Sequence, residues 1–335
     1  MKIGLTFDLR DESPLPAGAP DDFFEEFDSP ETVDSIAAVL KDLGHEVVQL
    51  GNGEQLLRQL LADPPDFVFN FAEGRGVSRS REARVPGVLE TLGIPYTGSD
   101  PATLGVCLDK SWTRTLVAAA GVMVPKGFVA DPRRDELEGL CDRNHLKLPV
   151  IAKPVCEGSS KGILSKCIIE RKQDFAPVVV ELGNIYQQSV LVEEFVVGDE
   201  LTVGIIGDNP QAVFGIMRVV PRQANDRFIY SLEVKRNYKQ LVDYECPARL
   251  DECATRAVEQ AALRAFHALG CRDVARLDFR LRDRVPYFLE ANPLPGLNPV
   301  TGDIVVMARA LGVSHAQVVA RILHAAMVRC GRNSL

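Results

Sequence analysis

The chain has 335 residues, more than a single ordinary core accommodates, so we expect two or three packed lobes. Hydrophobic residues make up 46% of it and charged residues 25%, which is ordinary for a globular protein. The net charge of −8 argues against a nucleic-acid-binding protein, which needs a basic face. Anionic small-molecule substrates stay open, because a site can be locally basic in an acidic protein.

The spacing of the cysteines and the length of the apolar runs indicate which cellular compartment to expect. The eight cysteines show no C-x-x-C pair and no zinc-type spacing with histidine, which is typical of reduced residues in a cytosolic protein. The N-terminus lacks the apolar run of a signal peptide, and no segment approaches the roughly 20 apolar residues of a membrane span. We therefore expect a cytoplasmic protein without a membrane partner.

The first 100 residues alternate between strand and helix patterns. Ser29-Pro30 is a typical helix start and Gly44 a typical helix end. We expect strands at 2–7, 46–50 and 66–71, helices at 29–44 and 54–61, and an acidic loop at 8–28. This alternation predicts an open α/β layer as the first domain, residues 1–100.

Two further lobes are expected, at 101–195 and 196–335. The central lobe should contain a helix at 109–120, strands at 125–129, 149–153, 163–169 and 189–195, and a helix from 171. The C-terminal lobe should contain strands at 200–207 and 211–219, a polar stretch at 221–248, a helix at 251–269, strands at 274–281 and 286–290, and two final helices. The predicted fold class is α/β with α+β lobes.

Glycine, serine and lysine cluster at 153–162, which reads K-P-V-C-E-G-S-S-K-G and follows an apolar strand. The backbone N–H groups and hydroxyls of such a loop can approach phosphate oxygens, and Lys153 and Lys161 would add positive charge. The P-loop pattern is absent from the chain. A plain turn between strands is therefore the alternative interpretation.

The segment 190–200 reads V-L-V-E-E-F-V-V-G-D-E, an apolar run that leads into acids. An adenine and ribose site needs an apolar slot, backbone hydrogen-bonding groups and a carboxylate for the ribose hydroxyls. The alternative is an edge strand that ends in solvated acids.

Polar residues at strand spacing give the strongest pattern. Arg276 and Asp278 share one face of a predicted strand, and Glu290 and Asn292 share a face of the next. Adjacent strands would bring these oxygen ligands together, and Mg²⁺ binds through a few such oxygens while leaving room for phosphate. The alternative is a solvent-facing hairpin end.

These segments resemble the motifs of ATP-grasp enzymes and, among them, of the D-alanine:D-alanine ligase branch. R-L-D and F-L-E-A-N-P-L-P-G resemble the ATP-grasp metal-binding segment. The branch is matched in order by G-I-P-Y-T-G-S, L-D-K at 108–110, P-V-I-A-K-P-V-C-E-G-S-S-K-G, L-V-E-E-F-V-V-G-D-E-L-T-V and E-V-K at 233–235. The resemblance covers residues 66–312 and implies an ATP-grasp fold behind an N-terminal open α/β domain.

The resemblance implies a role for each matching residue. The catalytic residues would be Arg276, which stabilises a tetrahedral oxyanion, Ser160 in a mobile phosphate-covering loop, and Lys235, which reaches a phosphate. ATP would be bound by Lys110, Lys153, Ser159, Glu193, Glu194, Phe195, Val196 and Glu200. Two Mg²⁺ ions, with Mn²⁺ as a possible substitute, would be held by Asp278, Glu290 and Asn292.

The substrate side departs from the family pattern. The N-terminal E-R-E-V-S segment is missing, Glu73 stands where the family has histidine, and Arg236 where it has tyrosine. Thr301 is only an approximate match to a serine that binds the second substrate's carboxylate. Arg236 favours an acidic substrate, unless it pairs with Glu233, Asp243 or the phosphates of ATP.

The resemblance thus implies an ADP-forming carboxylate–amine ligase that makes an amide or peptide bond through an acyl phosphate. Its substrates would be amino acids or peptides, in a pair other than two D-alanines. True D-alanine:D-alanine ligation in cell-wall synthesis and a catalytically silent ATP-binding protein are the alternatives. The resemblance also implies a homodimer.

Overall fold

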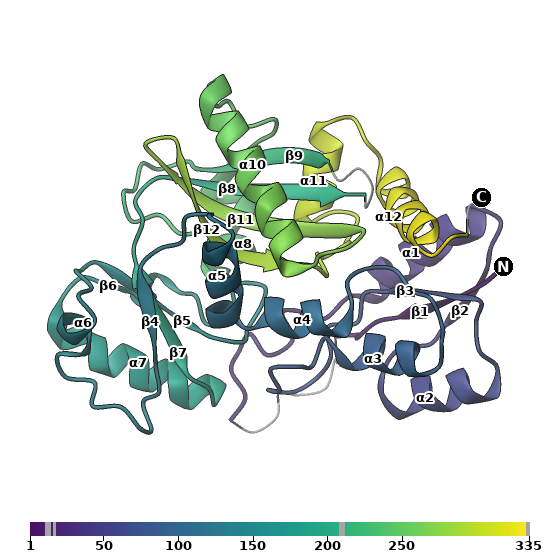
Figure 1. The fold of residues 1–335 in the computed structure, drawn as a ribbon, viewed down its shortest axis with the longest axis horizontal. Helices are drawn as coiled ribbons and strands as arrows, with labels where there is room; N and C mark the ends of the chain where they lie inside the picture. The colour runs from purple at the N-terminus through teal and green to yellow at the C-terminus, as the bar shows by residue number, and fades with distance from the viewer. Residues whose placement is uncertain (11–14, 16–17, 208–211, 333–335) are drawn as a thin grey trace.

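The computed structural model describes residues 1–10, 15, 18–207 and 212–332. The strands in these ranges form three sheets, each with its own covering helices (Figure 1). The expected loop at 8–28 and the expected strand at 211–219 both include residues outside the described ranges. The mixed helices and sheets confirm an α/β protein.

The N-terminal sheet is parallel, with strand order β2-β1-β3. Its strands are β1 (Lys2–Thr6), β2 (Glu46–Gln49) and β3 (Phe67–Asn70), and the helices of this region are α1 (Pro30–Asp42), α2 (Gly53–Ala62), α3 (Arg84–Thr91) and α4 (Pro101–Leu108). The Ser29 hydroxyl accepts from the Thr32 amide at 3.4 Å, which confirms the predicted cap of α1. The helix then buries Val33, Ile36 and Leu40 on one face.

The central sheet is antiparallel, with strand order β4-β7-β5-β6. Its elements are α5 (Lys110–Ala119), β4 (Gly127–Ala130), α6 (Leu140–Arg143), β5 (Val150–Pro154), β6 (Ile168–Ile169), α7 (Lys172–Tyr186) and β7 (Val190–Glu194). The predicted strand at 163–169 is wrong, because a short 3₁₀ helix at Ser165–Cys167 interrupts it. The Ser165 amide donates to Glu233 at 3.1 Å instead of to a neighbouring strand.

The C-terminal sheet is antiparallel, with strand order β10-β9-β8-β11-β12. The elements of this lobe are β8 (Asp199–Ile206), β9 (Val213–Pro221), α8 (Leu232–Arg236), α9 (Tyr238–Leu241), β10 (Val242–Glu245), α10 (Glu252–Leu269), β11 (Val274–Arg282), β12 (Val285–Asn292), α11 (Asp303–Ala310) and α12 (His315–Arg329). The expected polar stretch at 221–248 thus contains two short helices and an edge strand. Each is too short to show a clear hydrophobic period.

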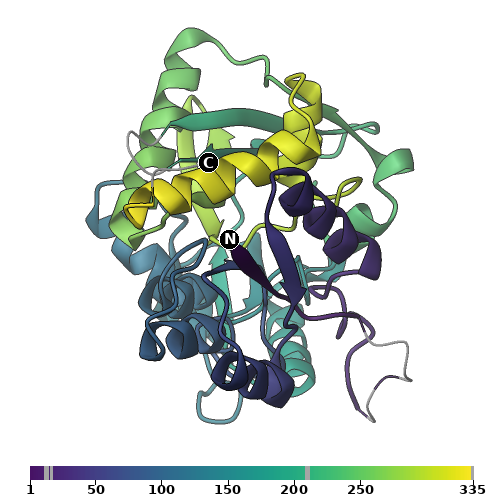
Figure 2. The same ribbon diagram turned by 90° about the vertical axis from the view of Figure 1, so that its right-hand side faces the viewer.

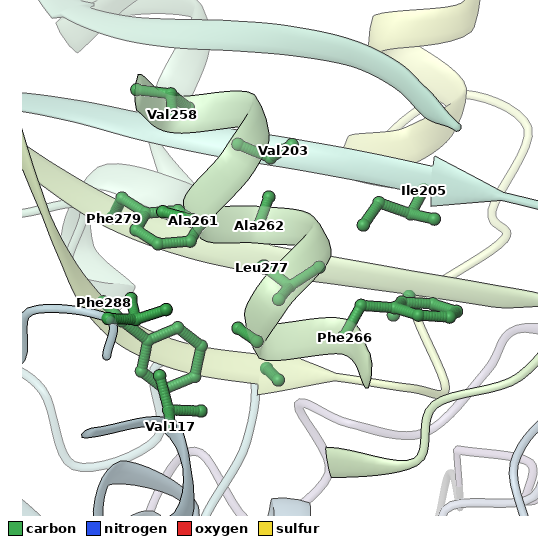
Figure 3. Packing of buried hydrophobic residues seen from close by; sticks show 14 of the residues in the cluster. Val117, Val203, Ile205, Val258, Ala261, Ala262, Phe266, Leu277, Phe279 and Phe288 are labelled. Carbon is green, nitrogen blue, oxygen red and sulfur yellow. The ribbon is translucent and has the colours of Figure 1, made fainter. Parts of the chain in front are cut away.

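Helix α10 builds the core of the C-terminal lobe. Ala262 and Phe266 on this helix are buried on the same face of the sheet as Leu277 and Phe279 of β11 (Figure 3). Truncating one such buried phenylalanine to alanine typically costs roughly 3–5 kcal/mol. This packing therefore holds β11 firmly, and β11 carries part of the site described below.

The C-terminal helices pack back onto the N-terminal domain. Helix α12 lies beside α1 (Figure 2), and its Ile322 and Leu323 share a core with Ile3 and Ile36. The domain boundaries near residues 100 and 195 stay predictions. Among the described residues, no single helix is long and apolar enough to cross a membrane, although α11 and α12 taken together, as a bent pair, pass by length and composition.

Candidate active site

Four predicted site residues lie side by side on strands β11 and β12. In the antiparallel register, Asp278 is opposite Glu290 and Arg276 is opposite Asn292. The register shifts directly after Asp278, as at a β-bulge, a feature that often re-aims a side chain beside a site. The strands thus gather the four residues in the way their spacing predicted, while their roles stay predictions.

The Arg276 guanidinium is buried and bound on three sides. It lies 3.0 Å from Asp278 Oδ2, 3.3 Å from Glu290 Oε1 and 3.0 Å from Asp303 Oδ2. Asp303 is the first residue of α11, and sequence reasoning missed it. Its one signal was an acid in the first turn of a helix that follows a Pro-Gly loop. The three carboxylates fix the orientation of the guanidinium.

The two opposed carboxylates have different proton affinities. Burial opposes ionisation of Glu290, but Lys110, whose Nζ lies 3.4 Å from Oε2, and Arg276 outweigh burial and lower its pKa to about 2. For Asp278 burial prevails over the attraction of Arg276 and raises the pKa to about 6. Both carboxyls are therefore mainly ionised at neutral pH and can act as oxygen ligands.

The donor set fits Mg²⁺ in the company of phosphate. Asp278 Oδ1 is buried without a hydrogen-bond partner among the described residues, and such an atom is costly unless a cation or water completes it. Asn292 Oδ1 accepts from the Leu294 amide at 3.0 Å, which orients that side chain. No group of three His, Cys, Asp or Glu suited to a metal occurs in the described ranges, so phosphate oxygens and water would have to complete the shell.

A cleft between the central and C-terminal sheets contains most of the predicted nucleotide residues. Its lining includes Lys153, Ser160, Glu193–Val196, Glu200, Lys235, Asp278 and Glu290. Glu193 is held by Lys153 at 2.6 Å and by Arg114 at 3.3 Å, and Glu200 is held by Arg280 at 2.8 Å. Sequence reasoning missed Arg114 and Arg280, because no motif contains them. Both glutamates are thereby fixed before any ligand binds.

The apolar part of the cleft lies around Phe195. The Arg280 and Arg227 guanidinium groups lie 5.5 Å and 5.8 Å from its ring centre, within cation–π range. Glu194 pairs with Arg282 at 2.9 Å. An apolar slot next to the carboxylate of Glu200 is what the predicted adenine and ribose site needs.

The phosphate loop, residues 154–162, covers one end of this cleft. Ser159 and Ser160 have φ angles of 49° and 59°, a left-handed conformation that costs of order 1–3 kcal/mol and often marks ligand-binding turns. The Ser160 hydroxyl donates to the Tyr230 carbonyl at 3.1 Å. Lys110 lies beneath the loop and donates to the Glu157 carbonyl.

Lys161 differs from its expected place. Its Nζ lies 2.6 Å from Glu157 and 3.3 Å from Glu26, in a buried cluster that includes Arg81. The expectation that it adds charge at the phosphates is therefore wrong. The sequence could not show the contact with Glu26, which is 135 residues away, although Glu157 is only four residues from Lys161.

A second, larger cavity adjoins the cleft, and we call it the substrate cavity because its lining includes Glu73 and Thr301, the predicted substrate residues. It contains Glu73, Ser159, Arg276, Asn292 and Thr301. Lys235 and Tyr230 line both cavities. Arg276 thus lines a cavity that shares two of its lining residues with the nucleotide cleft.

Arg236 does not line this cavity. Its guanidinium lies 3.2 Å from Asp21 and 3.0 Å from Glu25, in the acidic segment before α1. Neither Glu233 nor Asp243 is its partner. This pairing removes the observation that favoured an acidic substrate.

The wall formed by the N-terminal domain carries carboxyl groups instead. Asp28 and Glu73 line the substrate cavity, and Glu82 lines a narrow extension toward Lys110. Burial and neighbouring carboxylates raise the pKa of Glu73 well above its ordinary value, and burial raises that of Glu82 to about 8. Neither carboxyl has a hydrogen bond or ion pair within the described part of the chain. Only Glu73 was singled out from the sequence.

The cleft between two antiparallel sheets, the paired carboxylates and the adjoining cavity have the layout expected of an ATP-grasp carbon–nitrogen ligase, and a relative of that class at 32% identity covers 87% of the chain. The family model described as D-ala D-ala ligase C-terminus matches residues 117–324. The chain therefore belongs to the D-alanine–D-alanine ligase family.

Similar proteins of known name extend over most of the chain. The D-alanine–D-alanine ligase of Gluconobacter oxydans is 32% identical over 295 residues, covering 87% of this chain and 91% of that one. The corresponding ligase of Bordetella petrii is 34% identical over 275 residues, covering 81% and 79%.

Two solved structures share the fold. The D-alanine–D-alanine ligase from Bacillus anthracis complexed with ATP has a TM-score of 0.74 at 22% identity, covering 100% of this chain and 99% of that one. The VanG D-Ala:D-Ser ligase from Enterococcus faecalis has a TM-score of 0.69 at 20% identity, covering 97% and 99%.

Proposed function

We propose that the protein joins the carboxylate of one amino acid or peptide to the amine of another through an acyl phosphate, while ATP becomes ADP and phosphate. The observation that carries this proposal is the position of Arg276 between three carboxylates, on the wall of a substrate cavity that shares Lys235 with the nucleotide cleft. This arrangement lets a carboxylate meet the terminal phosphate.

The two steps balance without another reactant. A carboxylate oxygen of the first substrate attacks the γ-phosphorus, and ADP leaves. The amine nitrogen of the second substrate then attacks the acyl carbon, phosphate leaves, and the nitrogen loses a proton. In our proposal Lys110, Lys153 and Lys235 offset phosphate charge, and Arg276 stabilises the negative charge that develops on the acyl oxygen.

Asp278, Glu290 and Asn292 would hold the metal. We propose two Mg²⁺ ions, with Mn²⁺ as an acceptable substitute for the same oxygen ligands. When bound, such ions offset charge on the transferring phosphoryl group. The orphaned Oδ1 of Asp278 supports this assignment.

For the substrates, we propose a pair other than two D-alanines. The acidic wall with Glu73 and Glu82 supports a first substrate whose ammonium group approaches carboxyls that make no ion pair among the described residues. The absence of the family's E-R-E-V-S segment supports a changed first-substrate site. D-alanine:D-alanine ligation is the second candidate, favoured by the names of relatives at 30–34% identity.

Release of ADP with a panel of D- and L-amino acids tests these candidates, with products identified by mass spectrometry. We expect the highest kcat/KM with a pair that is not D-alanine and D-alanine. The highest value with two D-alanines would establish the second candidate. If no pair led to ADP release, the protein would be a catalytically silent ATP-binding protein.

The setting of the enzyme is also a proposal. The described residues include eight free cysteines, which supports a reducing, cytoplasmic location. We propose small-molecule substrates, no nucleic-acid or membrane partner, and the homodimer implied by the family resemblance.

A further inference from the structure

An acidic segment of the N-terminal domain reaches across to the phosphate loop. We call residues 21–26 the acidic strap. Glu26 Oε1 accepts a hydrogen bond from the Gly158 amide at 2.7 Å, and Asp22 Oδ2 accepts one from the Gly162 amide at 2.9 Å. Two strap carboxylates therefore hold two separate points of the loop.

Buried charges reinforce the first of these points. Arg81 Nη2 lies 2.9 Å from both carboxylate oxygens of Glu26, while its Nη1 donates to the Cys156 carbonyl at 2.8 Å. Lys161 Nζ lies 3.3 Å from Glu26. Charge-assisted hydrogen bonds in a buried setting are the strong ones, so Glu26 and Arg81 tie the loop to the N-terminal domain.

Gly158 makes this close approach possible. A Cβ atom at this position would lie 2.7 Å from Glu26 Oε1, nearer than real Cβ contacts allow. Gly158 has no positive φ, so its lack of a side chain serves the approach of Glu26 and not a special backbone conformation. A glycine at position 158 of the loop thus makes room for Glu26 of the acidic strap.

The strap also reaches the opposite wall of the site. Asp21 and Glu25 hold Arg236 at 3.2 Å and 3.0 Å, and Arg236 ends helix α8, which carries Lys235. Lys235 lines both cavities. One short segment therefore contacts both elements that enclose the phosphate end of the cleft.

We propose that Glu26 is a positioning residue that holds the phosphate loop closed over the nucleotide and so keeps water from the acyl phosphate. The charge of Glu26 is balanced by Arg81 and Lys161. Water exclusion matters because an acyl phosphate hydrolyses when water reaches it. The inference rests on the proposed function for the acyl phosphate, but its effect on nucleotide binding does not.

Two variants disturb the contact in different ways. Glu26→Gln removes the charge and keeps the shape, and Gly158→Ala keeps the charge and pushes the carboxylate away. Loss of a charged hydrogen bond typically changes an equilibrium by about 10-fold or more. We expect the Kd for ATP with Mg²⁺, measured by calorimetry without other substrates, to rise about 10-fold in both variants.

The ratio of ADP to amide product should also rise in both variants, because the intermediate loses its cover. Glu181→Gln is the matched control, since Glu181 forms an exposed ion pair with Lys166 on the same lobe and should change neither readout. An unchanged Kd in both variants would overturn the inference, and so would a lower Kd in Glu26→Gln. If Glu26→Gln does not fold, Gly158→Ala decides by the same criteria. Absence of any ligation by the native protein would refute the proposed function and leave the calorimetric test valid.

Discussion

The nucleotide cleft and the substrate cavity differ in how their buried charged residues are paired. On the nucleotide side, two glutamates that line the cleft each have a basic partner, Lys153 for Glu193 and Arg280 for Glu200. On the substrate side, Glu82 is buried without a described partner, and its pKa is raised. The nucleotide side is therefore preorganised, whereas the substrate side is incomplete until a ligand supplies charge.

The largest expected effect comes from the opposed carboxylates of the nucleotide side. Asp278→Asn and Glu290→Gln remove charge from the proposed metal site, so ATP turnover should fall by more than the roughly 10–100-fold typical of an outer-sphere metal partner. Circular dichroism should show an intact fold. Asp243→Asn, an exposed acid on the edge of the same sheet, is the control. Near-native turnover in either site variant would refute the metal assignment.

A variant of Arg276 should affect the two chemical steps to different extents. Arg276→Ala should lower amide formation by roughly 10²–10³-fold, as loss of one oxyanion donor typically does. Acyl-phosphate formation, trapped with hydroxylamine, should fall less, because the oxyanion develops only when the amine attacks. Arg256→Ala, which breaks an exposed helix ion pair, is the control. Equal losses in both assays would argue against this role.

The pH dependence of stability tests whether Glu82, on the substrate side, lacks a partner for its charge. Burial raises its folded-state pKa from 4.5 to about 8, so its contribution to stability is present below the unfolded pKa and is lost as the pH rises through about 8. Glu82→Gln should therefore unfold at a higher temperature than the native protein in alkaline buffer, with the difference shrinking toward about pH 5. A difference in unfolding temperature that does not depend on pH would mean that Glu82 is already compensated.

The smallest effect is expected at Arg236. Because it pairs with Asp21 and Glu25 in a partly exposed position, Arg236→Tyr should lower the free energy of unfolding by about 0–1 kcal/mol and leave the KM for amino acids nearly unchanged. Urea titration and steady-state kinetics measure the two quantities. A large rise in KM for a dicarboxylic substrate would instead restore an acidic-substrate role for Arg236.

The sequence predicted the nucleotide side better than the substrate side for a physical reason. Asp278 and Glu290 lie on neighbouring strands, where a period of two residues decides which side chains share a face. Glu26 meets Arg81 and Gly158 across 55 and 132 residues, through a loop that has no periodicity. Contacts of that kind depend on how the lobes pack, and no local pattern reports them.

The short elements at 221–248 were not predicted from the sequence, for a related reason. Helix α8 has only five residues, so one hydrophobic position, Leu232, is its whole buried face. The 3₁₀ helix at Ser165–Cys167 replaced a predicted strand because of a bond to Glu233 from another lobe. Shortness hides the first element from a local pattern, and a tertiary contact hides the second.

Transfer of oxygen from substrate to phosphate tests the central claim most directly. The first substrate is supplied with ¹⁸O in its carboxylate, and the released phosphate is analysed by mass spectrometry after ligation. The proposed acyl phosphate requires that one labelled oxygen appears in inorganic phosphate for each amide bond formed. Amide formation with unlabelled phosphate would contradict carboxylate activation by phosphoryl transfer.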